Sequence, residues 1–259
     1  MRQAAPVWVV VVALLLIWES ATRFLEIPRY LLPAPSAVAR ALVDSLDVLI
    51  RVHSRVTLLE AGVGLVTAVA LGIAVGSLLH LVPLLRRAFY PLIIISQTIP
   101  SIVLVPLLVI WFGYGMLPKL LIVVIACFFP IAVAVVDGLG SADAARLKLL
   151  RSMGASPWQE FILVKLPTAL PSLFTGLRVA ATYAVMAAVI GEWMGADAGL
   201  GMYIVRSAHS FRTEQVFAGI VLISLYSVLL FKIVDWARHV ILPWERYVTE
   251  QQATREQKT

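Results

Sequence analysis

The chain has few charged residues, one cysteine and no phosphate-binding loop, and each shortage excludes a class of protein. Charged residues make up 14% of its 259 residues and hydrophobic residues 61%, whereas soluble domains carry about 25% charged residues. The single cysteine, Cys127, excludes an intrachain disulfide. No Gly-x-x-x-x-Gly-Lys-Ser/Thr segment occurs, so the chain lacks this device for cradling the phosphates of ATP.

Metal chemistry and nucleic-acid binding are also poorly supported by the residues present. The four histidines lie far apart, without a His-x-x-x-His or Glu-x-x-His pattern. The net charge of +6 comes from scattered lysines and arginines rather than a basic block. Scattered basic residues are typical of loops at a membrane surface. A membrane-embedded enzyme or a secondary carrier with its own ion-coupling charges stays a weaker alternative.

What the sequence has in abundance is long apolar runs. Backbone polar groups find no water in hydrocarbon, so a spanning chain must be helical or a closed barrel. Barrel strands alternate polar and apolar residues, which these runs do not. We therefore predict one all-α, polytopic membrane domain over residues 1–259, with six spans and an extramembrane loop at about 141–167. The spans are expected at about 7–24, 58–81, 90–112, 120–136, 173–195 and 216–234.

An even number of spans places both termini on the same side of the membrane. Lysines and arginines are somewhat more numerous on the side that holds the termini and the 141–167 loop, which predicts a cytoplasmic location for them. Short helices are expected on the outer side within 35–50, capped by Ser36, and within 196–215. Glu60 and Asp235 lie near span ends, and we expect both carboxylates to be solvated.

The loop between the fourth and fifth spans encodes two short helices joined at a glycine. Ser141 is a candidate N-cap for the first helix, and Gly154 stands where that helix would end. Ser156, Pro157 and Gln159 then form a capping-box pattern, and Pro167 and Pro171 are expected to break the chain before the next span. From the residues alone, this elbow is either a connector or a docking element for a cytoplasmic partner.

Polar residues interrupt the third span, where they would be costly without a cavity or a partner. Gln97, Thr98 and Ser101 surround Pro100, which removes a backbone donor. These residues are candidates for lining a solute pathway, with helix–helix hydrogen bonding as the alternative. Glu192 follows a charge-free run near the outer end of the fifth span. It would line an outer gate or pair with an outer-loop arginine.

The loop also resembles a motif of importer permeases driven by ATP-binding-cassette subunits. In that motif Glu-Ala-Ala precedes a glycine by three residues, and Ile-x-Leu-Pro follows it after nine. Here Gly154 precedes Val164-Lys165-Leu166-Pro167 at that spacing, whereas Lys148-Leu149-Leu150 replaces Glu-Ala-Ala. The segments "SQTIPSIVLVPLLVIWFGYG" and "GEWMGADAGLG" resemble the nitrate, sulfonate and taurine permease group. Other segments, such as "CFFPIAVAVVDGL", look most like permeases for pyrimidine precursors of thiamine.

The resemblance implies a type I importer permease in a bacterial or archaeal plasma membrane, without catalysis or cofactor of its own. It implies cytoplasmic ATPase subunits that bind ATP and Mg²⁺, an extracytoplasmic solute-binding protein, and a second permease copy, most simply in a homodimer. The coupling residues carried over from the motif are Arg151, Gly154, Ala155, Ser156, Leu166 and Pro167. A thiamine-precursor pyrimidine is the expected solute, with an alkanesulfonate, taurine or nitrate as the alternative.

Overall fold

The structure is a computed structural model that describes residues 5–244, all of whose regular elements are helices. The long helices are α1 (Ala5–Phe24), α4 (Arg55–Leu81), α7 (Met116–Gly140), α10 (Leu166–Glu192) and α12 (Thr213–Ile241). The shorter ones are α2 (Pro35–Asp44), α3 (Leu46–Val48), α5 (Pro83–Ser96), α6 (Ser101–Phe112), α8 (Ala144–Ser152), α9 (Pro157–Glu160) and α11 (Leu200–His209), with π-helical turns η1 (Leu49–Ser54) and η2 (Phe161–Lys165).

The centre of the bundle is the contact of α4, α7 and α10. Small residues recur every fourth position along α4, at Gly64, Ala68, Gly72 and Gly76. A Cβ atom built on Gly72 would lie 2.9 Å from the Cβ atom of Ile131 on α7, closer than real side chains approach. Lipid tails are as apolar as leucine, so close backbone approach of this kind, rather than exclusion of water, drives helix association in a bilayer.

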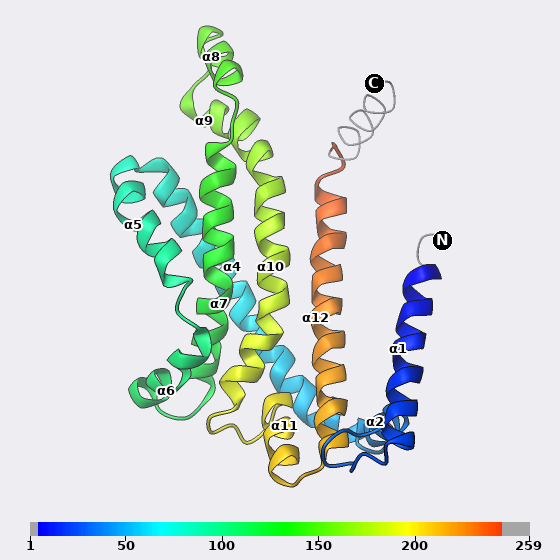
Figure 1. The fold of residues 1–259 in the computed structure, drawn as a ribbon. Coiled ribbons are helices and arrows are strands. Elements are labelled where there is room, and N and C mark those ends of the chain that lie inside the picture. Colours follow the sequence, from blue (N-terminus) through cyan, green and yellow to red (C-terminus); the bar gives the residue numbers. More distant parts are fainter. Residues whose placement is uncertain (1–4, 245–259) are drawn as a thin grey trace.

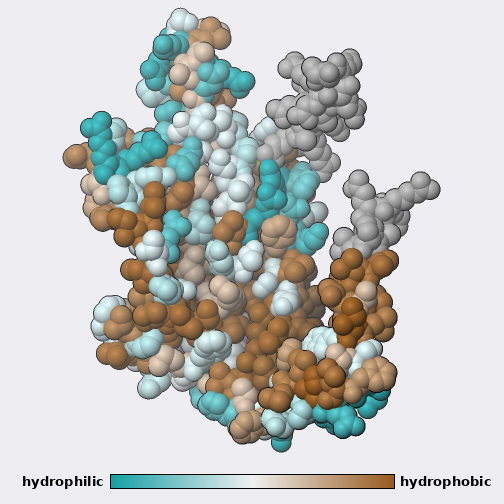
Figure 2. Space-filling view, in the orientation of Figure 1, coloured by the Kyte–Doolittle hydropathy of each residue, from teal (hydrophilic) through white to brown (hydrophobic). Residues whose placement is uncertain are grey.

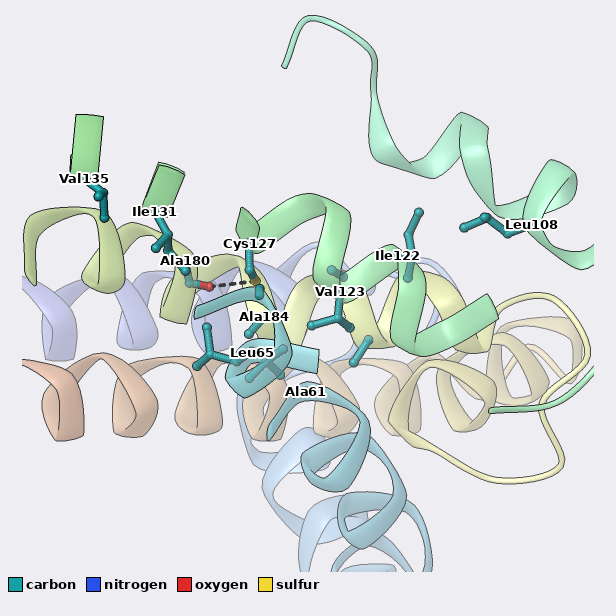
Figure 3. Close-up of a cluster of buried hydrophobic side chains, with 14 of the residues drawn as sticks. Ala61, Leu65, Leu108, Ile122, Val123, Cys127, Ile131, Val135, Ala180 and Ala184 are labelled. Atoms are coloured by element: carbon teal, nitrogen blue, oxygen red, sulfur yellow. Dashed lines mark hydrogen bonds between the residues drawn. The ribbon is translucent and has the colours of Figure 1, made fainter. Parts of the chain in front are cut away.

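The third helix of this core, α10, approaches α7 in the same way. A Cβ atom on Gly176 of α10 would lie 2.6 Å from that of Ala134, and one on Gly138 of α7 would lie 2.9 Å from that of Ser172. Figure 3 shows the apolar side chains of α4, α7 and α10 meeting around Cys127, whose thiol donates to the carbonyl of Ala180 at 3.3 Å. Cys127 is fully buried, as expected for a small apolar side chain.

The observed helices confirm the all-helical membrane fold and correct one of the predicted spans. Among the described residues, four helical segments are long and apolar enough to cross a membrane: 46–81, 116–140, 157–192 and 213–241. The third predicted span, 90–112, is not one helix, because α5 and α6 are bent by 101° at a break over residues 97–100. Counting this pair as one span gives five. The predicted span 7–24 corresponds to α1, which is not one of these four segments.

The two ends of the bundle differ in character. Figure 1 shows α8 and α9 projecting beyond one end, towards which the start of α1 and the end of α12 also point, whereas α2 and α11 lie at the other end. The short helices predicted in 35–50 and 196–215 are thus α2 and α11. Ser36 does not cap α2 as predicted, because the helix begins at Pro35 with Ala34 as its N-cap, and the Ser36 hydroxyl donates to Glu19 at 2.8 Å. Figure 2 shows hydrophilic side chains on the projecting segment and along the opposite rim, with hydrophobic side chains covering α1 and much of the surface between.

The tight contact of α4 with α7 makes a matched pair of substitutions informative. A Cβ atom on Gly72 would overlap Ile131, whereas one on Gly62 of the same helix would have nothing within 4 Å. We expect Gly72→Val to lower the free energy of unfolding in detergent by about 1–3 kcal/mol relative to Gly62→Val, the usual cost of overpacking. Thermal or denaturant unfolding of both variants measures this. Equal stability of the two would show that the α4–α7 contact does not hold the bundle together.

Candidate functional site

A cavity of about 320 Å³ lies beside the break between α5 and α6. Gln97, Pro100 and Ser101 from the break line one side of it, as the sequence predicts for a cavity-facing set. The opposite side is formed by the middle of α7, including Phe129, and by α10, including Tyr183. Thr98 is not among the lining residues, and its hydroxyl donates to the carbonyl of Ile95 at 2.7 Å.

The lining of this cavity is polar on one side and carries no charge. Its residues are Ser96, Gln97, Ile99, Pro100, Ser101, Ile125, Ala126, Phe129, Pro130, Val179, Tyr183 and Met186. A small concave site with apolar walls and a few polar groups is the usual form of a small-molecule site. Sequence analysis predicted the polar side but not Phe129, Tyr183 and Met186, because their pattern cannot be distinguished from ordinary lipid-facing residues without knowing where the break lies.

The second candidate site is the elbow that projects from the bundle. Gly154 ends α8 with φ +79°, the left-handed value predicted for it. The amide of Ala155 donates to the carbonyl of Leu150 and that of Gly154 to Arg151, each at 3.0 Å, which is a Schellman motif. Ser156 then begins α9 with a capping box, in which its amide donates to Gln159 Oε1 at 2.8 Å. The prediction of two capped helices around a glycine turn is confirmed.

An ion pair fixes the angle between the two arms of the elbow. Arg151 on α8 donates through two nitrogens to Glu160 at the end of α9, at 2.7 and 3.0 Å. The hydrogen bonds to Glu160 raise the pKa of Arg151 above its usual value. The arginine side chain is 63% exposed, so the pair contributes little to stability and matters mainly for geometry. The sequence analysis did not predict a role for Glu160, because no local pattern indicates which cation it pairs with.

The elbow presents apolar side chains to its surroundings. Met153 is 74% exposed, Trp158 is 67% exposed and Leu149 is 62% exposed. The rings of Trp158 and Phe161 stack with centroids 5.8 Å apart, so this surface is ordered. Contiguous exposed apolar residues framed by charge are typical of a surface that another protein covers.

Two details of the predicted loop are wrong. Asp143, not Ser141, caps α8, because its carboxylate accepts from the amide of Ala145 at 2.8 Å. Pro167 and Pro171 do not break the chain, since both lie within α10. The π turn η2 ends at Lys165, and Pro167 lies in the first turn of α10, which follows it without a gap. Leu166 and Pro167 are the first residues of α10, so the helical chain runs without a break from the elbow into the span.

Glu192 lies away from the cavity, in a buried polar cluster at the end of the bundle that carries α2 and α11. Its carboxylate accepts from Thr57 Oγ1 at 2.6 Å and from the amide of Gly201 at the start of α11. The amide of Leu200 donates to the same Thr57 hydroxyl at 2.9 Å. The residue is fully buried, and its carboxylate accepts hydrogen bonds from these groups rather than from an outer-loop arginine. Glu192 thus binds the first turn of α11, where a helix attracts negative charge.

Two other acidic residues are paired rather than solvated, contrary to the prediction. Glu60 on α4 is 2% exposed and accepts from Lys119 Nζ on α7 at 3.0 Å. Asp235 on α12 accepts from Arg178 on α10 at 3.1 Å. Both pairs join neighbouring helices, because a carboxylate inside a bilayer needs a partner. The two members of each pair lie far apart in the sequence, so no local pattern predicted these contacts.

Comparison with known proteins identifies the family. The model of the family described as binding-protein-dependent transport system inner membrane component matches residues 68–247, and the chain belongs to this family. It is 39% identical over 233 residues to the formylaminopyrimidine transport permease protein ThiX of Halalkalibacterium halodurans, covering 90% of this chain and 93% of ThiX. It is 31% identical over 232 residues to the taurine transport system permease protein TauC of Escherichia coli, covering 88% and 84% of the two chains.

Solved structures show the same fold. A chain of the MetNI methionine ABC transporter in an inward-facing conformation aligns with a TM-score of 0.52 at 22% identity, covering 79% of this chain and 97% of that chain. The protein is thus the permease component of an ABC importer of the prokaryotic inner membrane. It is not itself an ATPase and takes no cofactor: a separate ATPase binds ATP, and a binding protein delivers the solute.

Proposed function

We propose that this permease imports a small neutral heterocycle, namely a thiamine-precursor pyrimidine or a close relative of one. The observation that carries the proposal is the 39% identity to ThiX along nearly the whole of both chains. The uncharged lining of the cavity beside the α5–α6 break supports it, because a neutral solute needs no counter-charge there. Gln97, Pro100 and Ser101 are the pathway residues in this proposal, whereas Thr98 and Glu192 act on helix geometry.

A sulfonate or nitrate importer is the second candidate, and the 31% identity to TauC favours it. Uptake of labelled formylaminopyrimidine and of labelled taurine, measured on the reconstituted importer with its binding protein and ATPase, separates the two. We expect saturable, ATP-dependent uptake of the pyrimidine. Uptake of taurine alone would transfer the assignment to the sulfonate group.

The elbow is, in this proposal, the element that docks on the ATPase. Its exposed apolar side chains Leu149, Met153 and Trp158 offer contacts that a partner protein would bury. Its continuity with α10 means that a displacement of the elbow moves the helix that lines the cavity. Arg151, Gly154, Ala155 and Ser156 set the shape of the docking surface, and Leu166 and Pro167 connect it to the span. The simplest assembly has two identical permeases and two ATPases.

Docking on a cytoplasmic ATPase fixes the orientation of the chain. The elbow and the described ends of α1 and α12 would face the cytoplasm, and α2 and α11 would face outwards. The termini themselves, residues 1–4 and 245–259, lie outside the described residues. A cysteine at Lys148 should react only after permeabilisation of the cells, and one at Arg206 should react in intact cells. The reverse pattern of cysteine reactivity would mean that the elbow faces outwards and that α11 faces the cytoplasm.

The left-handed turn at Gly154 gives the sharpest test of coupling. A Cβ atom there would meet nothing within 4 Å, so a substitution acts through the backbone angle alone. Valine disfavours φ +79° strongly, whereas asparagine tolerates it. We expect Gly154→Val to abolish solute uptake or retention of the ATPase, and Gly154→Asn to preserve both. Ser156→Ala should be mild, since losing a cap costs about 1 kcal/mol.

The measurements are membrane insertion, co-purification of the ATPase and solute-stimulated ATP hydrolysis for all three variants. Insertion serves as the control, because the spans do not depend on this turn. Normal coupling in Gly154→Val would reduce the elbow to a connector.

A further inference from the structure

The cavity beside the α5–α6 break contains unused hydrogen-bonding capacity. The Gln97 carboxamide and the hydroxyls of Ser101 and Tyr183 all line it, and within residues 5–244 these three side chains have no hydrogen-bond partner. Ser96, in contrast, donates its hydroxyl to the carbonyl of Ile93 at 2.7 Å. Gln97 and Tyr183 are exposed, Tyr183 by 43%, so these groups are open to a solute in the cavity, and their convergence there offers it several hydrogen bonds.

We propose that Gln97 and Tyr183 hold the edge of a planar heterocycle that carries an amino group next to a ring nitrogen, with Phe129 as an apolar wall. The inference rests on the proposed function and adds the specificity-determining residues. A carboxamide offers a donor and an acceptor side by side. An amino group beside a ring nitrogen offers the complementary acceptor and donor, which is how glutamine recognises adenine.

The other walls of the cavity suit a flat ring. Phe129 and Tyr183 come from different helices, α7 and α10, and Met186 lies about one turn beyond Tyr183. Stacking on aromatic side chains is available to every heterocyclic base, because each has a π face. A volume of about 320 Å³ is near the lower limit for small-molecule sites, which fits one ring with small substituents.

The charge of the lining disfavours an anion. A sulfonate or nitrate ion at this depth would lose its hydration and needs a cation or several strong donors in return. No lysine, arginine or histidine lines the cavity. Arg178 precedes the lining residue Val179 on α10, but its guanidinium already pairs with Asp235 at 3.1 Å. The cavity therefore selects against the solutes of the second candidate function.

The test uses the complete importer in proteoliposomes, with permease, ATPase and binding protein. The probes are formylaminopyrimidine and its analogue with an oxo group in place of the amino group. Tyr183→Phe and Gln97→Leu remove the proposed partners. Thr182→Val is the control, because it removes the neighbouring hydroxyl, which bonds to the carbonyl of Arg178 and does not line the cavity. Assembly and ATP hydrolysis stimulated by the loaded binding protein are measured alongside uptake.

We expect Gln97→Leu to lower the specificity constant for formylaminopyrimidine about tenfold and to reduce its preference over the oxo analogue, as expected for losing a bidentate contact. Tyr183→Phe should act in the same direction, and Thr182→Val should match the unmodified importer. If Gln97→Leu fails to assemble, Gln97→Met takes its place: it keeps the length of the side chain and loses both the amide donor and the amide acceptor, so the same loss of preference is expected.

Two negative outcomes are distinguishable. If the unmodified importer takes up formylaminopyrimidine but the variants at positions 97 and 183 behave like Thr182→Val, then Gln97 and Tyr183 do not hold the solute. The proposed function still stands in that case. If the unmodified importer takes up taurine and no pyrimidine, the proposed function fails, and the proposed role of Gln97 and Tyr183 fails with it.

Discussion

The close approach of α4, α7 and α10 is the constraint on which the rest of the structure depends. Glycines and alanines at every fourth position of α4 bring its backbone against Val123, Ile131 and Val135 of α7. Such contact compensates for the absence of a hydrophobic driving force between helices in lipid. It also fixes the positions of α7 and α10 beside the cavity, and α6 packs against this core through Val105 and Leu108.

The two candidate sites are mechanically connected through α10. The elbow continues through η2 into this helix without interruption, and the middle of α10 contributes Tyr183 and Met186 to the cavity. At the end opposite the elbow, Glu192 binds the first turn of α11 through the amide of Gly201 and reaches α4 through Thr57. One helix thus connects the proposed ATPase-facing surface, the cavity and the outer rim. This arrangement suits a protein in which ATP binding on one side must change access on the other.

Local signals made much of this predictable from the sequence. The capping box at Ser156 and the left-handed turn at Gly154 depend on residues within a few positions, and both are confirmed. The polar residues around Pro100 lie at the α5–α6 break, where a single span was predicted, and Gln97 and Ser101 line the cavity beside it. The small-residue spacing from Gly64 to Gly76 was also present in the sequence, but it was not recognised as a packing surface.

Long-range pairings were not predictable. Glu60 with Lys119, and Asp235 with Arg178, are ion pairs between helices whose relative rotation no local pattern specifies. The same holds for Tyr183, which becomes a cavity residue only because the α5–α6 break lies opposite it. Whether a proline ends a helix also depends on context: Pro167 lies in the first turn of α10.

In the proposed function the cavity beside the α5–α6 break lies on the path of the solute, and chemical modification at position 101 tests this placement. A cysteine placed there can be modified with a small methanethiosulfonate reagent in the assembled importer. Native Cys127 can stay because it is fully buried. The account predicts that modification of Ser101→Cys blocks uptake, that the ATPase stays bound, and that prior loading with solute slows the reaction. Normal uptake by a fully modified importer would contradict it.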